Sequence, residues 1–271
     1  MSSPVRLVPS PREKLWGVYD TGPWFEAAGK KIGEVWFLGP DGEPLPQLVK
    51  FVFTSEKLSV QVHPGDEYAW KYEGTPGKTE MWHVLRAGPG AAIALGLKQR
   101  ISRERLREAA LSGEIEALLE WVPVEAGDTI FTPTGTIHAI GPEVALVEIQ
   151  QQSDITYRLY DYGRPRQLHL EKALDVSDPG PHPGKAKPVE VAPGVQRLVE
   201  CAYFTTELLE VRGSYRCVPD DARPQILVAV EGCGVLAGEA FAAGAAWQVP
   251  AGGEAFAIVS EGCRVLRTHA C

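Results

Sequence analysis

The sequence predicts an all-β protein with two barrels or sandwiches and one small helical segment. Short apolar runs recur along its 271 residues, and 28 glycines and 22 prolines divide them with turns. This combination is typical of all-β domains. A chain of this length has room for roughly two domains. Only residues 102–120 have apolar residues at helical spacing.

The first strands are expected at residues 34–38, 48–53 and 58–62, after an irregular stretch of about 30 residues. Between residues 58 and 63, three apolar residues alternate with Ser59, Gln61 and His63. Because successive side chains of a strand point to opposite faces, these three polar residues project together from one face. A Pro-Gly-Asp turn and a loop containing glycine and proline follow.

Further strands are expected at 80–85, 91–97, 144–151 and on both sides of a turn within 121–132. The helical segment at 102–120 is interpreted as a cover on the barrel. Residues 176–193 are rich in proline and predict a linker or surface strap. Short strands resume after residue 194. We therefore expect a first domain at 1–175, a linker at 176–193 and a second domain at 194–271.

The amino-acid composition limits the expected binding partners and the expected cellular location of the protein. The net charge is −8, and lysines and arginines do not cluster, so nucleic acid is not an expected partner. The five cysteines are odd in number and form no CxxC motif, which favours reduced thiols in the cytoplasm. No signal peptide or membrane-spanning run is predicted. The sequence leaves the oligomeric state open between monomer and homodimer.

Four residues form a candidate metal site. Gln61 and His63 lie on one predicted strand, Glu80 begins another, and His138 lies in a Pro-Thr-Gly-Thr-Ile-His segment. A single histidine is more often structural than a ligand, so only the combination carries weight. Oxygen and imidazole ligands suit zinc, manganese or iron(II). His83 lies three residues after Glu80, so on a strand it faces the opposite way.

Four motifs carry a resemblance to a known family: LSVQVHP, GKTEMWHVL, PTGTIHAI and EIQQQSDITYRLYDYGR. Together they resemble class I mannose-6-phosphate isomerase in its short bacterial form, and the match covers roughly residues 14–166 in order. The resemblance implies two cupin barrels, of which the second is metal-free. It also implies one zinc ion per chain, bound by Gln61, His63, Glu80 and His138.

The same resemblance implies the reaction and the other site residues. The reaction is the reversible isomerisation of D-mannose 6-phosphate and D-fructose 6-phosphate through an enediol or enediolate, a step of carbohydrate metabolism. Lys78, Glu148 and Arg158 match catalytic positions, and Ser59 and Trp16 match positions that line the substrate pocket. The sequence does not rank Lys78 against Glu148 as the base.

Other interpretations stay open. The chain could isomerise another sugar or sugar phosphate, or bind one without turnover. An iron dioxygenase is disfavoured by the Gln-x-His pair at Gln61 and His63, because the usual ligands of such enzymes are two histidines and one carboxylate with open positions. Arg158 could instead form a structural ion pair with Asp154 or Asp161.

Overall fold

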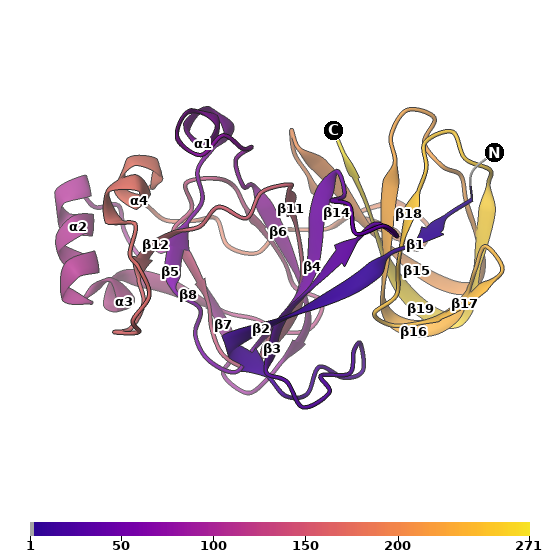
Figure 1. The fold of residues 1–271 in the computed structure, drawn as a ribbon, viewed down its shortest axis with the longest axis horizontal. Helices are drawn as coiled ribbons and strands as arrows, with labels where there is room; N and C mark the ends of the chain where they lie inside the picture. The colour runs from indigo at the N-terminus through magenta and orange to yellow at the C-terminus, as the bar shows by residue number, and fades with distance from the viewer. Residues whose placement is uncertain (1–2) are drawn as a thin grey trace.

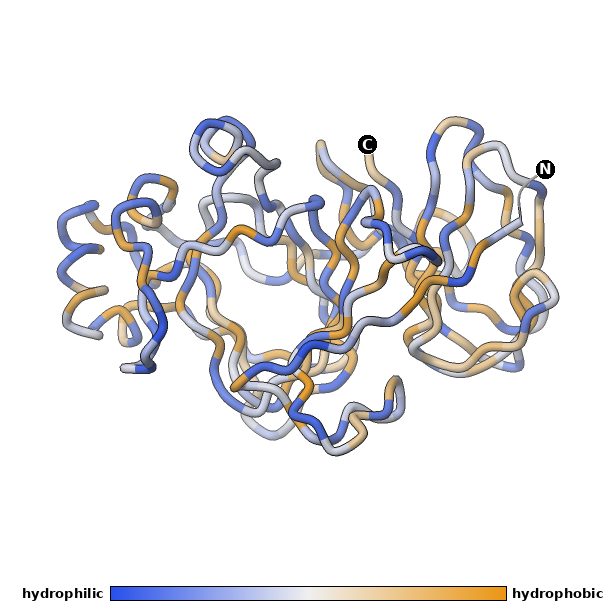
Figure 2. The backbone as a smooth tube through the Cα atoms, in the orientation of Figure 1, coloured by the Kyte–Doolittle hydropathy of each residue, from blue (hydrophilic) through white to orange (hydrophobic). Residues whose placement is uncertain are grey.

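The computed structural model describes residues 3–271. Three antiparallel sheets account for most of the regular structure in this range, which confirms the predicted all-β class. Figure 2 shows hydrophobic residues along many of the paired strands, and both hydrophilic and hydrophobic residues on the helices at the left edge of the view. None of the helices in the described range has the length and apolar character that crossing a bilayer requires.

The first two sheets enclose the inner core of the N-terminal part. The six-stranded sheet has the order β2 (Val8–Val18), β3 (Ile32–Leu38), β4 (Gln47–Thr54), β11 (Val144–Gln151), β6 (Glu80–Ala87) and β9 (Thr129–Thr132). The five-stranded sheet has the order β12 (Tyr157–Tyr160), β5 (Val60–Val62), β10 (His138–Ile140), β7 (Ala92–Leu97) and β8 (Leu119–Pro123). Side chains from both sheets pack together between them, among them Val52, Val84 and Ile93.

The third sheet belongs mainly to the C-terminal part and curves around a core of its own (Figure 1). Its path runs through β1 (Val5–Arg6), β18 (Ala246–Val249), β16 (Gln225–Leu236), β19 (Phe256–Ala270), β15 (Phe204–Cys217), β14 (Val195–Glu200) and β13 (Val189–Ala192). An eighth strand, β17 (Glu239–Ala242), pairs with β16. The N-terminal strand β1 therefore lies in the sheet that the end of the chain builds, where Val5 is opposite Gln248.

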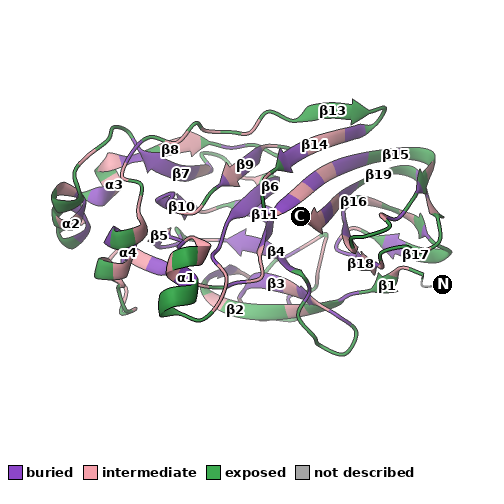
Figure 3. Ribbon diagram, turned by 90° about the horizontal axis from the view of Figure 1, so that it is seen from above, coloured by how far each residue is buried: buried purple, intermediate pink, exposed green. Residues whose placement is uncertain are grey.

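Strand β4 shows how the sheets share their cores, because all eight of its residues are buried. Val49, Phe51 and Phe53 point outward and pack against C-terminal residues such as Ile226 and Val228. Lys50 and Val52 alternate with them and therefore point inward. The buried strands between the two parts are visible in Figure 3.

The helical segment agrees with the prediction for residues 102–120. It consists of α2 (Arg103–Ser112) and α3 (Ile115–Leu118). Ser102 Oγ accepts a hydrogen bond from the Arg105 backbone N–H at 3.1 Å, the usual way to satisfy a free donor at a helix start. Gly113 ends α2 with φ of 81°, a left-handed conformation that glycine adopts at little cost.

Two further helices were not predicted: α1 (Asp66–Tyr72), where a loop was expected, and α4 (Leu170–Val176). The proline-rich segment after α4 runs along the N-terminal part as a strap. It makes isolated β-bridges between Thr136 and Asp178, Gly96 and Pro181, and Ile130 and Lys185. It ends in β13, the exposed edge strand of the third sheet.

Candidate metal and substrate site

A cavity of about 260 Å³ lies between the six-stranded and five-stranded sheets. Six of the nine predicted site residues line it: Trp16, Ser59, Gln61, Lys78, Glu148 and Arg158. The other three, His63, Glu80 and His138, are almost completely buried. Their ligand atoms all lie within 4.8 Å of one another.

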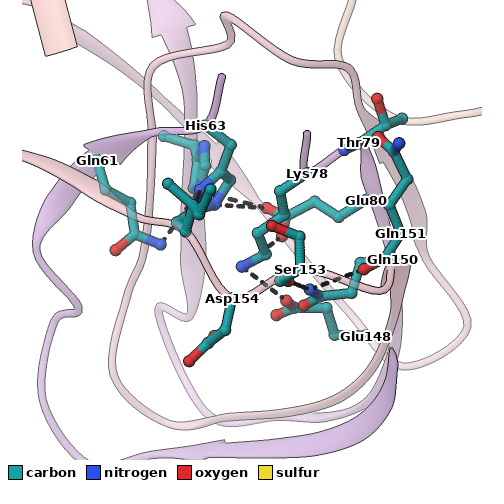
Figure 4. Close-up of polar contacts among 12 residues, drawn as sticks. Gln61, His63, Lys78, Thr79, Glu80, Glu148, Gln150, Gln151, Ser153 and Asp154 are labelled. Carbon is teal, nitrogen blue, oxygen red and sulfur yellow. Dashed lines mark hydrogen bonds and ion pairs between the residues drawn. The ribbon is translucent and has the colours of Figure 1, made fainter. Parts of the chain in front are cut away.

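The two histidines of this cluster direct acceptor atoms at the same carboxylate oxygen. His63 Nε2 lies 3.4 Å from Glu80 Oε1 (Figure 4). His138 Nε2 lies 3.4 Å from the same oxygen. The opposite ring nitrogens contact backbone carbonyls: His63 Nδ1 lies 2.7 Å from Ile155 O and His138 Nδ1 lies 2.9 Å from Thr136 O. A carbonyl only accepts, so each Nδ1 carries the proton and each Nε2 presents a lone pair.

This arrangement suits a cation. Three acceptors converge, and neither His63 Nε2 nor Glu80 Oε1 has a hydrogen-bond donor in the described part of the chain. Burial lowers the pKa of His63, and it lowers the pKa of His138 to about 3, against the opposing effect of Glu80. Both imidazoles are therefore neutral near pH 7, the state in which histidine binds a metal.

Gln61 lies beside this cluster. It is directly opposite His138 across β5 and β10, and its Nε2 lies 3.2 Å from His138 Nε2. Its Oε1 accepts a hydrogen bond from Ser59 Oγ at 3.1 Å. Half a turn of the Gln61 amide would bring its oxygen to the cluster, so Gln61 can supply a fourth ligand.

A buried chain of alternating charges connects the cluster to the far side of the cavity. Lys78 Nζ lies 3.1 Å from Glu80 Oε2 and 3.2 Å from Glu148 Oε1. Lys50 Nζ lies 3.1 Å from Glu148 Oε1 and 3.4 Å from Glu34 Oε1. Glu148 on β11 lies directly opposite Lys50 on β4 and, on its other side, directly opposite Trp82 on β6.

Sequence reasoning missed Lys50 and Glu34. The signal was present, because Lys50 interrupts the apolar strand QLVKFVFT and Glu34 begins the apolar run EVWFL. Charged residues are almost never fully buried without a partner. A lone charge at an inward position of such a strand therefore indicates a buried ionic group.

Burial and neighbouring charges set the ionisation of the chain. Burial raises the pKa of Glu148 to about 7, although Lys50 and Lys78 act in the opposite direction. Burial alone would lower the pKa of Lys78, but Glu148 and Glu80 outweigh it and raise the pKa. Lys78 therefore stays an ammonium group near neutral pH.

Arg158 is a cation that has no acidic partner in the part of the chain that the structure describes. It lies on β12 opposite Gln61, and its guanidinium donates to the Gln167 carbonyl at 2.6 Å. Within the described range it makes no ion pair with Asp154 or Asp161. Asp161 instead accepts hydrogen bonds from Arg164 and from Arg166, which also lines the cavity. This wall of the cavity therefore carries more positive than negative charge.

His83 lies outside the site, as its parity predicted. Its Nδ1 lies 3.0 Å from Thr129 Oγ1 on the opposite face of β6. Burial and the charge of Arg264 lower its pKa to about 4.

Comparisons with known proteins agree on one family. No protein-family model matches the chain. A mannose-6-phosphate isomerase of Streptococcus mutans is 40% identical over 194 residues, which are 68% of this chain and 60% of that protein. The chain thus spans less than two thirds of this relative. Mannose-6-phosphate isomerase ManA of Bacillus subtilis is 37% identical over 230 residues, 78% of this chain and 72% of that protein.

Solved structures agree with these relatives. The crystal structure of mannose 6-phosphate isomerase from Bacillus subtilis matches 99% of this chain and 100% of its own, with 28% identity and a TM-score of 0.88. A zinc-bound mannose 6-phosphate isomerase shares the fold over 99% of this chain and 100% of its own, with 16% identity and a TM-score of 0.77.

Proposed function

Because this chain belongs to the mannose-6-phosphate isomerase family, we propose that it interconverts D-mannose 6-phosphate and D-fructose 6-phosphate. One observation of the structure carries the proposal furthest. The acceptor atoms of His63, Glu80 and His138 converge in a buried site at the edge of a cavity that offers further acid, base and cationic groups.

The metal of this proposal is one zinc ion per chain, held by Gln61, His63, Glu80 and His138. Two neutral imidazoles, a carboxylate and an amide oxygen fit zinc in number and chemistry. When bound, zinc supplies a Lewis acid for the oxygen atoms at the reacting carbons of the sugar.

The other site residues would transfer the proton, stabilise negative charge and line the pocket. The reaction moves a proton between C1 and C2 of the open-chain sugar through an enediolate. Glu148 lies in the cavity wall with an acceptor carboxylate and is a candidate to carry that proton. Lys78 is held between Glu80 and Glu148, so it is suited to stabilise negative charge on the substrate, as is Arg158. Ser59 and Trp16 line the pocket.

The small-molecule partner is a sugar phosphate. The phosphate adds negative charge to the substrate, and Arg158 is a pocket cation that forms no ion pair with an acidic residue among residues 3–271. Arg166 adds a second guanidinium, which Asp161 holds in place through two hydrogen bonds. Guanidinium groups bind phosphate oxygens with two parallel hydrogen bonds.

The proposed architecture is a pair of cupin barrels. The metal-binding barrel comprises residues 1–175 and includes the helical insert. Residues 176–193 form the strap, and residues 194–271 form the metal-free barrel. The enclosed cavity between the first two sheets and the curved third sheet support this division. A cytoplasmic location is supported by the five cysteines, all of which are unpaired among residues 3–271.

A coupled assay of mannose 6-phosphate conversion tests the proposal, before and after chelation and with zinc added back. His63→Asn should abolish zinc binding and activity. His83→Asn is its matched control, because both histidines are buried and only His63 belongs to the cluster. Loss of activity on chelation and its recovery with zinc would support the proposal. Binding of mannose 6-phosphate without turnover by the zinc-loaded protein would replace it with a binding function.

A second assay separates Glu148 from Lys78. Solvent-proton exchange at C2 is measured in Glu148→Gln and in Lys78→Met. We expect exchange to be lost in Glu148→Gln, and exchange at the wild-type rate would exclude Glu148 as the proton carrier.

A further inference from the structure

Trp82 lies in the apolar part of the cavity wall, together with Trp16, Val52 and Ile140. It follows Glu80 by two positions on β6, so both side chains point to the inner face of the sheet. The indole is only 1% exposed. Its ring packs edge to face against His138, with 5.2 Å between the centroids.

The indole N–H of Trp82 has no acceptor anywhere in residues 3–271. Three other tryptophans differ: Trp24 donates to Val230 O at 2.8 Å, Trp36 to Glu34 Oε2 at 3.1 Å and Trp247 to Glu239 Oε2 at 3.5 Å. A buried indole N–H usually finds a partner, because an unpaired buried donor costs free energy. Trp82 therefore carries an unpaired, buried donor on a side chain that lines the cavity.

The chemistry of this donor limits its partner. An indole N–H only donates, so the lysine and arginine side chains of the cavity cannot satisfy it. Glu148, its neighbour across the strands, forms ion pairs with Lys50 and Lys78 through Oε1 and accepts no hydrogen bond from the indole. A phosphate group is strongly hydrated and disfavours an apolar wall. A sugar hydroxyl suits it, since the adjoining C–H groups can pack against the apolar side chains.

We infer that the Trp82 indole N–H donates a hydrogen bond to a hydroxyl oxygen of the bound sugar phosphate, which makes Trp82 a specificity-determining residue. The inference rests on the proposed isomerase function. A site that hydrogen-bonds a substrate hydroxyl discriminates strongly against analogues without it, because its buried polar group is then left unpaired.

The test uses the zinc-loaded protein and Trp82→Phe, which keeps an aromatic ring and removes the N–H. Trp247→Phe is the matched control, because Trp247 is equally buried but lies in the third sheet. The probes are mannose 6-phosphate as substrate and its analogues lacking O3, O4 or O5 as competitive inhibitors. Zinc content is measured in every variant.

With Trp82→Phe, we expect kcat/KM for mannose 6-phosphate to fall by roughly 10- to 100-fold, the usual effect of an unpaired buried partner. One deoxy analogue should inhibit wild type and Trp82→Phe equally well, because it lacks the oxygen that Trp82 binds. The other analogues should lose inhibition in the variant, and Trp247→Phe should leave all values unchanged.

Three outcomes would overturn the inference. The first is wild-type kinetics in Trp82→Phe, the second is an equal loss of inhibition with every analogue, and the third is loss of zinc. The second and third outcomes would assign Trp82 a packing role against His138. A wild-type protein that neither converts nor binds mannose 6-phosphate would instead overturn the proposed function, and this inference with it. The wild-type measurement therefore separates the two failures.

Discussion

Replacing Lys50 by methionine should destabilise the protein by about 3 kcal/mol, a typical cost of removing one partner from a buried ion pair. Lys50 is 2% exposed and contacts Glu34 and Glu148. Burial alone would raise the pKa of Glu34, but Lys50 and then Lys14 lower it from 4.5 to about 2. At about 1.4 kcal/mol per pKa unit, this net shift, to which Lys14 and Trp36 also contribute, corresponds to about 3 kcal/mol.

The matched control is Lys57→Met. Lys57 pairs with Glu116 at 3.2 Å, but both side chains are substantially exposed, and an exposed pair contributes at most about 1 kcal/mol. Urea denaturation of the zinc-loaded variants measures both effects. In the Lys50→Met background, Glu34→Gln should recover part of the loss, because it removes a carboxylate that has lost its main partner. A Lys50→Met protein as stable as Lys57→Met would refute the reasoning.

Three further predictions concern pH, substrate affinity and metal. Because the pKa of His83 is lowered, its contribution to the free energy of unfolding is fully present above pH 6.5, and up to about 3 kcal/mol is lost as the pH falls to 4. The free energy of unfolding of His83→Asn should lack this dependence on pH. An unchanged dependence would contradict the lowered pKa of His83. Asp161→Asn, which weakens the support of Arg166, should raise KM for mannose 6-phosphate about tenfold at unchanged zinc content; an unaltered KM would exclude the positioning role of Asp161. Removal of zinc present at 100 times its Kd should lower stability by about 2.7 kcal/mol, and a melting temperature indifferent to chelation would argue against the site.

The strand pattern predicted the central part of the fold because a half-buried strand records its orientation in sequence. The alternation around Gln61 and His63 placed both side chains on the cavity face of the five-stranded sheet, where Gln61 and His138 are now opposite one another. Parity also separated Glu80 from His83. The helical segment was readable because Ser102 and Gly113 mark the ends of α2.

The remaining features depend on contacts between distant segments. Lys50 has a local signal, but its partners Glu34 and Glu148 lie on two other strands, and only sheet order brings them together. Helix α1 follows Pro64-Gly65, which indicates a turn from local sequence alone. The pairing of β1 with β18 joins residues from opposite ends of the chain. The sequence of neither short segment indicates which strand it pairs with.

Ribosomal synthesis makes β1 long before its partner exists. Strand β18 begins at Ala246, some 240 positions after β1 ends at Arg6, so at typical translation rates β1 waits roughly 10 to 50 seconds. During this time the outward residues of β4, such as Val49 and Phe51, also lack the C-terminal strands that cover them. The nascent N-terminal part thus exposes an apolar, aggregation-prone face to other chains. Slower translation or limited chaperone capacity should therefore lower the yield of folded protein.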